Sequence, residues 1–194
     1  MLDKKLAKYN LILASGSPRR QQFLRDLGLK FEIRVKEVVE DYPKDLKSVE
    51  ITDFLALLKA KEFENELLDN DILITSDTIV WFENNALGKP KNAVEATQIL
   101  ASLSGKTHEV ISSVCIKTKL KTTLFHDITK VSFHQLNNEM IDFYINEYMP
   151  FDKAGAYGVQ EWIGFVGVSK IEGSYTNIMG LPVDKLFAFL KDLP

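Results

Sequence analysis

The sequence predicts an α/β protein in which helices flank a mixed β-sheet. Short apolar runs that end at turn residues alternate along the chain with longer segments whose apolar positions recur at helical spacing. Hydrophobic residues make up 45% of the 194 residues and charged residues 26%, which is typical of a globular protein. Because no linker or internal repeat divides the chain, we expect a single domain over residues 1–194.

The first strand and helix are predicted from local chemistry. Residues 10–15 are short, apolar and followed by small polar residues, as in a buried strand. The next helix should have Ser17 as N-cap and Pro18 at its first position. Gly28 then marks its end.

The remaining elements follow from the same signals. We expect strands at residues 31–36, 72–82, 108–118, 122–134 and about 163–171, and helices at 49–68, 92–103, 138–148 and after Pro182. The third strand is interrupted at Ser76-Asp77-Thr78, and residues 83–85 form a tight turn. Asn92 caps its helix, and Gly105 ends it.

Charge and composition exclude several classes of protein. A formal net charge of −3 gives no general attraction to nucleic acid or anionic lipid. No apolar run approaches the length of a membrane span, and residues 11–14 are too few for a signal-peptide core. The single Cys115 excludes an internal disulfide and suits a reducing compartment. We therefore expect a soluble, cytoplasmic protein.

Residues 15–20 (SGSPRR) join the first strand to the first helix and could hold an anion. The free N–H groups and the positive end of the dipole at a helix N-terminus attract phosphate, and Arg19 and Arg20 add charge. The spacing is not that of a Walker loop. The alternative is structural, because Ser-Pro commonly starts helices and arginines commonly lie at the surface.

Asp77 lies in the very apolar segment 72–82. A carboxylate there costs free energy unless it is paired, hydrogen-bonded or bound to a metal, which favours a functional site. The alternative places Asp77 in a turn at the end of the strand. The residues alone leave both interpretations open.

Three further residues have both a functional and a structural interpretation. Lys89 lies in the stiff loop 87–90, and Lys59 lies on a helix among apolar neighbours, but either lysine could be a solvated surface residue. Residues 153–160 combine small residues with Gln160, whose amide can donate to and accept from a base edge. A plain turn with a surface glutamine is the alternative.

Other chemistries are excluded. The three histidines have no metal-ligand spacing, and a single cysteine cannot build a thiolate zinc site. Neither G-x-S-x-G nor G-x-G-x-x-G occurs, which removes the hydrolase-elbow and dinucleotide-binding interpretations.

Together these segments resemble the Maf family. The resemblance runs nearly end to end and in the same order, through ILASGSPRR (12–20), SDTIV (76–80), LGKP (87–90), LSGKTHEV (103–110), DKAGAYGVQ (152–160) and MGLP (179–182). It implies an ITPase-like (Maf/Ham1-type) mixed α/β fold with a cleft between two lobes, usually in a homodimer. It also implies metal-dependent hydrolysis of nucleoside triphosphates between the α- and β-phosphates.

The resemblance assigns roles to residues of this chain. Asp77 matches the proton acceptor, and the residues that bear on substrate choice match Arg19, Thr78 and Gln160. The expected phosphate contacts are Ser15, Ser17, Arg20, Lys59 and Lys89. Glu40, one of three acidic candidates in KEVVED, would bind Mg²⁺ or Mn²⁺ together with Asp77.

Within the family, the Arg, Thr and Gln combination resembles the branch that acts on dTTP and UTP. Two departures are Ser76, where alanine is expected, and Trp162 shortly after the glutamine, where glycine is more usual. The alternatives are a 7-methyl-GTP pyrophosphatase of the same family and a non-catalytic nucleotide-binding regulator of cell division. A nucleic-acid-binding module is disfavoured, because the chain has no basic stripe with interleaved aromatics.

Overall fold

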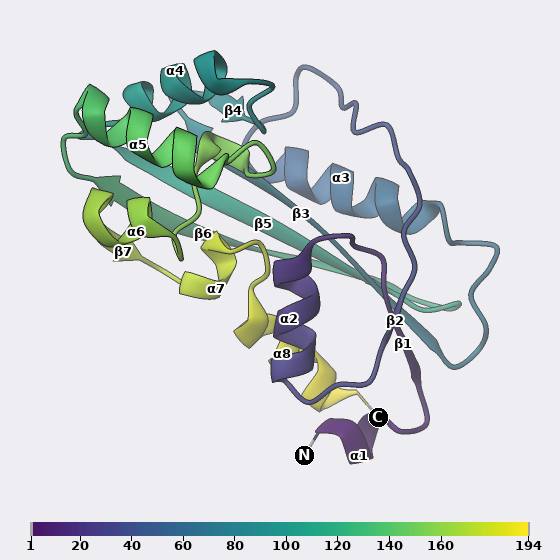
Figure 1. The fold of residues 1–194 in the computed structure, drawn as a ribbon. Helices are drawn as coiled ribbons and strands as arrows, with labels where there is room; N and C mark the ends of the chain where they lie inside the picture. Colours follow the sequence, from purple (N-terminus) through teal and green to yellow (C-terminus); the bar gives the residue numbers. More distant parts are fainter. Residues whose placement is uncertain (1, 194) are drawn as a thin grey trace. The chain divides into compact units, whose positions relative to one another are not determined.

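The computed structural model describes residues 2–193, and their strands form a mixed seven-stranded sheet (Figure 1). The strand order is β2-β1-β3-β5-β6-β7, and β4 pairs with β3. Strand β1 is parallel to β2 and β3, whereas β4 and β7 are antiparallel to β3 and β6. The strands are β1 Asn10–Leu13, β2 Glu32–Ile33, β3 Asp71–Phe82, β4 Asn85–Leu87, β5 Thr107–Lys117, β6 Thr122–Phe133 and β7 Val168–Glu172. The predicted α/β class is confirmed.

The chain divides into two compact units. The first contains residues 2–77, 112–127 and 180–193, and the second contains residues 78–111 and 128–179. The chain passes from one unit to the other inside strands β3, β5 and β6. Compactness is not a test of independent folding, so the single domain expected over residues 1–194 stays a prediction. The cleft expected from the resemblance also stays a prediction.

In the first unit, helices cover both faces of the sheet. They are α1 Leu2–Leu6, α2 Pro18–Asp26, α3 Val49–Lys61 and α8 Val183–Asp192. Successive residues of a strand point to opposite faces, and neighbours on β1 accordingly join different cores. Leu13 packs in a cluster with Leu24 of α2 and Leu186 of α8, whereas Ile12 packs with Ala56 of α3. The first unit is therefore a three-layered α/β structure, with α3 on one face and α2 and α8 on the other (Figure 1).

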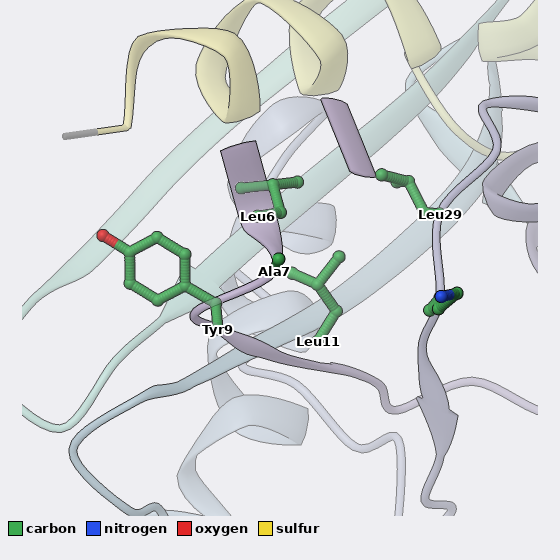
Figure 2. Close-up of a pocket in the computed structure, with 6 residues that line it drawn as sticks. Leu6, Ala7, Tyr9, Leu11 and Leu29 are labelled. Atoms are coloured by element: carbon green, nitrogen blue, oxygen red, sulfur yellow. The ribbon is translucent and has the colours of Figure 1, made fainter. Parts of the chain in front are cut away.

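A pocket in the first unit lies where α1 leads into β1 (Figure 2). It is lined by Leu6, Ala7, Tyr9, Leu11, Leu29 and Lys30. None of the residues predicted to act on a substrate lines it, so this pocket is not the candidate site.

The second unit has one core of its own. Its helices are α4 Ala93–Leu103, α5 Asn138–Tyr148, α6 Trp162–Gly167 and α7 Tyr175–Ile178, with a 3₁₀ turn η1 at Ala154–Ala156. Helix α4 packs against α5 and η1. Leu100 of α4, Tyr144 of α5 and Ile163 of α6 have no exposed surface, and they pack with Val131 of β6 in one cluster. The segment that precedes Gln160 is thus anchored on a buried core.

The predicted helix signals are confirmed. The Ser17 hydroxyl accepts a hydrogen bond from the amide of Arg20 at 3.5 Å. Asn92 caps α4 by accepting from the amide of Glu95 at 3.0 Å. Helix α5 has the predicted bounds of 138–148. These elements are specified by side chains a few residues away, so the sequence contains the whole signal.

One correction concerns strand β3, which runs without interruption from Asp71 to Phe82. The expected break at residues 76–78 is wrong, and so is the alternative that Asp77 lies in a turn. The polar side chains in the strand have partners inside the fold, because Ser76 donates to the carbonyl of Gly180 at 3.3 Å and Asp77 is paired with Lys59. Their burial therefore does not force the strand to end.

Two elements are shorter than predicted. Strand β2 has only two residues instead of the six predicted at 31–36, and the apolar Val35 beyond it is 59% exposed rather than buried. Helix α3 ends at Lys61 instead of residue 68, and turns follow it. Phe63 and Leu67 are nevertheless buried, so the apolar pattern that extended the predicted helix belongs to packed turns.

The strand predicted at about 163–171 is wrong over its first half, which forms α6 before β7 begins at Val168. A short apolar run does not distinguish a strand from a helix by its pattern alone. In the structure the helix lies close to the turn before it: a Cβ at Gly164 would lie 1.9 Å from the carbonyl oxygen of Val159. Only glycine permits this close approach of the helix to the preceding turn.

No helix among residues 2–193 is both long and apolar enough to span a bilayer.

Candidate functional site

Asp77 of β3 is a buried carboxylate with a specific partner. Its side chain is 8% exposed, and its Oδ1 lies 2.6 Å from Nζ of Lys59 on α3. Helix α3 packs on the face of the sheet lined by Leu73, and Thr75 fixes it there by donating to the carbonyl of Ala56 at 2.7 Å. An unpaired carboxylate in this position would be costly, so Lys59 supplies the compensation that the sequence pattern requires.

Glu40 shares the same lysine. Its Oε1 lies 2.8 Å from Lys59 Nζ, and its side chain is 51% exposed. The residue lies in the segment without regular structure between β2 and α3. Both carboxylates expected to bind a metal are therefore held on one ammonium group, one of them buried and the other open to solvent.

The two serines expected to contact phosphate hold the start of α2. Ser15 is 7% exposed, and its hydroxyl accepts from the amide of Ser17 at 3.3 Å. Ser17 in turn caps the helix by accepting from the amide of Arg20. Both hydroxyls thus organise the turn between β1 and α2. Arg19, the second residue of α2, is half-buried.

Arg20 makes several bonds within the protein. Its Nη1 donates to the carbonyl of Ser76 at 2.7 Å, and its Nε donates to the carbonyl of Gly180 at 2.8 Å. Burial lowers the pKa of Arg20, and the Asp77 charge opposes that effect. Arg20 therefore joins α2 to β3 immediately before Asp77, a structural role beside the phosphate contact expected of it.

Glu40 and Asp77 are the two carboxylates to compare with the needs of a divalent cation. Among residues 2–193, no group of three or more His, Cys, Asp or Glu side chains is arranged to hold a metal ion. Mg²⁺ is commonly bound through one or two carboxylates, with waters and substrate phosphates completing its shell. The two carboxylates already share a cation, Lys59, so their arrangement suits this mode of binding.

The second unit contains the other predicted residues. Thr78 follows Asp77 on β3 and is half-buried, whereas Lys89 is exposed in the loop after β4. Gly155 donates from its amide to the carbonyl of Gly88 at 3.1 Å, which joins this loop to the segment before Gln160. Gln160 is half-buried in a turn that ends at residue 161.

The sequence analysis missed the residues that support these positions. Gly180 accepts hydrogen bonds from both Arg20 and Ser76, so the hydroxyl of Ser76 has a partner where the family pattern has alanine. Tyr144 and Glu161 bond to each other next to Gln160. No local signal identifies these pairs, because their members come from distant parts of the chain or are typical of an ordinary helix face.

The fold is similar to that of a solved structure. The solved structure of the Staphylococcus aureus Ham1 protein is similar over 94% of this chain and 98% of its own, with a TM-score of 0.51 and 15% identity. This likeness supports the predicted ITPase-like class of α/β fold.

The family follows from sequence. The model of the Maf-like protein family matches residues 10–193, and the chain belongs to that family. A Flavobacterium johnsoniae protein called dTTP/UTP pyrophosphatase is 63% identical over the full length of both chains. A Christiangramia forsetii protein of the same name is 50% identical over 100% of this chain and 98% of its own. The predicted family is confirmed.

Proposed function

We propose that this protein hydrolyses dTTP and UTP to the nucleoside monophosphate and pyrophosphate. The observation that carries the proposal is the buried pairing of Asp77 with Lys59, beside the exposed Glu40, in the unit that also contains the N-terminus of α2. A base, cations for phosphate and carboxylates for a metal are the groups that phosphoryl transfer needs. The names of relatives that are 63% and 50% identical support the choice of substrates.

In the proposed reaction, water attacks the α-phosphorus in line with the leaving pyrophosphate. A new bond forms between the water oxygen and the α-phosphorus, and the bond to the bridging α–β oxygen breaks. Asp77 accepts the proton that the water loses. Arg19 and Lys59 neutralise the negative charge of the phosphates, and such neutralisation is the main contribution of a phosphoryl-transfer site. Lys89 stays a predicted phosphate contact.

Lys59 has two successive roles in the proposed reaction. Without substrate its ammonium neutralises Asp77 and Glu40. With a triphosphate bound, the same ammonium bonds to phosphate oxygen, and Asp77 becomes available to the water.

We also propose that Glu40 and Asp77 hold Mg²⁺ or Mn²⁺ together with the substrate. The ion supplies positive charge to the phosphates and lowers the pKa of a bound water. Because the protein offers only two carboxylates for this ion, metal affinity should rise sharply when a triphosphate is present.

The test is hydrolysis of a panel of nucleotides by the purified protein, with separation of the products by anion-exchange chromatography. We expect UTP and dTTP to yield UMP and dTMP with pyrophosphate, and EDTA to abolish the reaction. In H₂¹⁸O, the label should enter the monophosphate. Label in pyrophosphate would show attack at the β-phosphorus, and a preference for 7-methyl-GTP would support the alternative branch of the family.

A regulator that binds nucleotides without cutting them would bind UTP in calorimetry and leave it intact for hours. The buried Asp77 favours the enzyme, because simple binding of a negatively charged triphosphate gains nothing from another negative charge in the site. The homodimer and the cytoplasmic location stay predictions, to be tested by light scattering and by cell fractionation.

A further inference from the structure

One buried hydroxyl joins both ends of the turn that contains Gln160. The turn is closed by the amide of Glu161, which donates to the carbonyl of Gly158 at 3.0 Å. Tyr144 of α5 accepts from the amide of Gly158 at 2.9 Å. The same Tyr144 hydroxyl donates to Oε2 of Glu161. Gln160 is the third residue of this turn, and the side chain of Tyr144 is bonded to both ends of the turn.

Tyr144, which bonds to both ends of the turn, is itself held in place. Tyr144 has no exposed surface and lies in the core of the second unit. The other carboxylate oxygen of Glu161 lies 3.1 Å from Nζ of Lys153, which is 8% exposed and also pairs with Asp152 at 2.6 Å. Burial, and next the bond to Glu161, raise the pKa of the Tyr144 hydroxyl, which therefore keeps the proton that it donates.

The Gln160 amide lies against the turn that Tyr144 holds. A Cβ added at Gly158 would lie 3.0 Å from Nε2 of Gln160 and 2.8 Å from Cδ of Glu161. The amide nitrogen is thus folded back over the glycine. A shift of residue 158 or of residue 161 would displace the Gln160 side chain with it.

We propose that Tyr144 is a positioning residue for base selection, holding the turn 158–161 so that Gln160 presents its amide to the base in one orientation. This inference rests on the proposed function and on Gln160 as the residue that bonds to the base. Discrimination between uracil and cytosine depends on leaving groups of the wrong base unpaired. A glutamine free to turn its amide would bond to either base, and selectivity would fall while hydrolysis continued.

The first test is Tyr144→Phe, which removes only the hydroxyl. Tyr148→Phe is the matched control, since Tyr148 stacks on Tyr144 at 5.1 Å between ring centroids and is 39% exposed. We expect Tyr144→Phe to reduce the UTP to CTP ratio of kcat/KM by about fivefold or more. Its kcat for UTP should stay within about threefold of the parent, and the control should change neither value.

Gly158→Ala is a second variant that does not depend on how Tyr144→Phe folds. The added methyl group should displace both the Glu161 carboxylate and the Gln160 amide, the nearest side chains to it, and so reduce the same ratio without removing any hydrogen-bonding group. Amide hydrogen exchange supplies a measurement without substrate: in Tyr144→Phe, the amide of residue 158 should exchange at least about tenfold faster.

The outcomes separate the two proposals. A parent protein that cuts no triphosphate overturns the proposed function, and with it any role of Tyr144 in selecting a base. A parent that prefers UTP, with a ratio unchanged in both Tyr144→Phe and Gly158→Ala, overturns the positioning role alone. Equal loss of rate on UTP and CTP also overturns it, because it shows a general structural effect.

Discussion

Lys59 Nζ lies 2.6 Å from Oδ1 of Asp77, although the two residues belong to different elements, a helix and a strand. The lysine side chain is 18% exposed and the carboxylate 8% exposed. Asp77 depends on this partner, since removal of Lys59 would leave a buried carboxylate without the ammonium that pairs with it, whereas Lys59 also pairs with Glu40. Removal of Lys59 alone should therefore destabilise the first unit, and the proposed base lies inside an apolar strand with this lysine as its partner.

Asp77→Asn should lower kcat for UTP by about 10²- to 10⁴-fold, the usual cost of a lost general base. Asparagine keeps the shape of the side chain but does not accept the proton of water. Asp127→Asn is the matched control, because Asp127 also lies on a strand of the first unit and pairs with a lysine, Lys185, at 2.6 Å. Turnover of Asp77→Asn within about threefold of the parent would exclude Asp77 as the base.

Arg19→Ala should weaken binding of a non-hydrolysable UTP analogue by about 1.5–3 kcal/mol, or about 10- to 150-fold. Lysine should restore little of this loss, because its point charge does not reproduce the planar fork of the guanidinium. Arg25→Ala, in the last turn of the same helix, is the control. Full recovery in Arg19→Lys, measured by calorimetry, would show that charge alone matters at this position.

Arg20 should behave differently from its neighbour. Arg20→Ala removes hydrogen bonds to the carbonyls of Ser76 and Gly180, so it should lower the free energy of unfolding by about 2–4 kcal/mol. Arg19→Ala should lower that free energy less than Arg20→Ala does, because the guanidinium of Arg20 is bonded to two backbone carbonyls far apart in the sequence. Urea unfolding measures both, and equal stabilities of the two variants would contradict the structural role of Arg20.

Stability should also depend on pH through His108. This residue is 2% exposed, and burial lowers its pKa from 6.5 to about 4. Between pH 6.5 and 4 the unfolded chain binds a proton that the folded chain excludes, so the stability contributed by the neutral histidine is present above pH 6.5 and lost as the pH falls. At about 1.4 kcal/mol for each pH unit, the loss amounts to about 3 kcal/mol.

Urea midpoints at pH 7, 6 and 5 measure this dependence. His108→Gln should flatten it, because glutamine does not titrate. The parent and His108→Gln share their carboxylates, so the difference between their slopes isolates His108. Identical slopes would show that His108 does not contribute.

The success of the sequence prediction depended on how local each signal was. The caps of α2 and α4 were predicted because Ser17 and Asn92 bond to amides three residues away. The residues alone left Asp77 between a strand and a turn, since its partner Lys59 is 18 residues distant and the pairing is tertiary. The family resemblance named both residues, but not their contact.

The residues around Gln160 were less predictable. Tyr144 resembles any apolar position on an amphipathic helix, and nothing in the sequence indicates that its hydroxyl meets Gly158 and Glu161. Likewise, residues 163–167 lie in α6 where a strand is predicted, because a short apolar run does not distinguish a strand from a helix. Contacts of this kind become visible only in the three-dimensional structure.

The last prediction concerns the choice of base. The phosphates, which Arg19, Lys59 and Lys89 are proposed to contact, are shared by all nucleotides, so discrimination must come from the pocket of the base. Uracil and thymine present an N3–H between two carbonyls. The side-chain amide of Gln160 can accept a hydrogen bond from the N3–H and donate one to a neighbouring carbonyl. Thr78 can add a hydroxyl. Cytosine replaces the N3–H with an acceptor and one carbonyl with an amine.

A pocket arranged for uracil therefore leaves groups of cytosine unpaired, at about 1–3 kcal/mol each. We expect kcat/KM for UTP and dTTP to exceed that for CTP or dATP by at least about tenfold. Gln160→Glu should shrink the UTP to CTP ratio, because the carboxylate has no amide donor for a carbonyl of uracil and can accept from the amine of cytosine. Gln22→Glu, on an exposed position of α2, controls for the added charge. An unchanged ratio in Gln160→Glu would exclude Gln160 as the residue that selects the base.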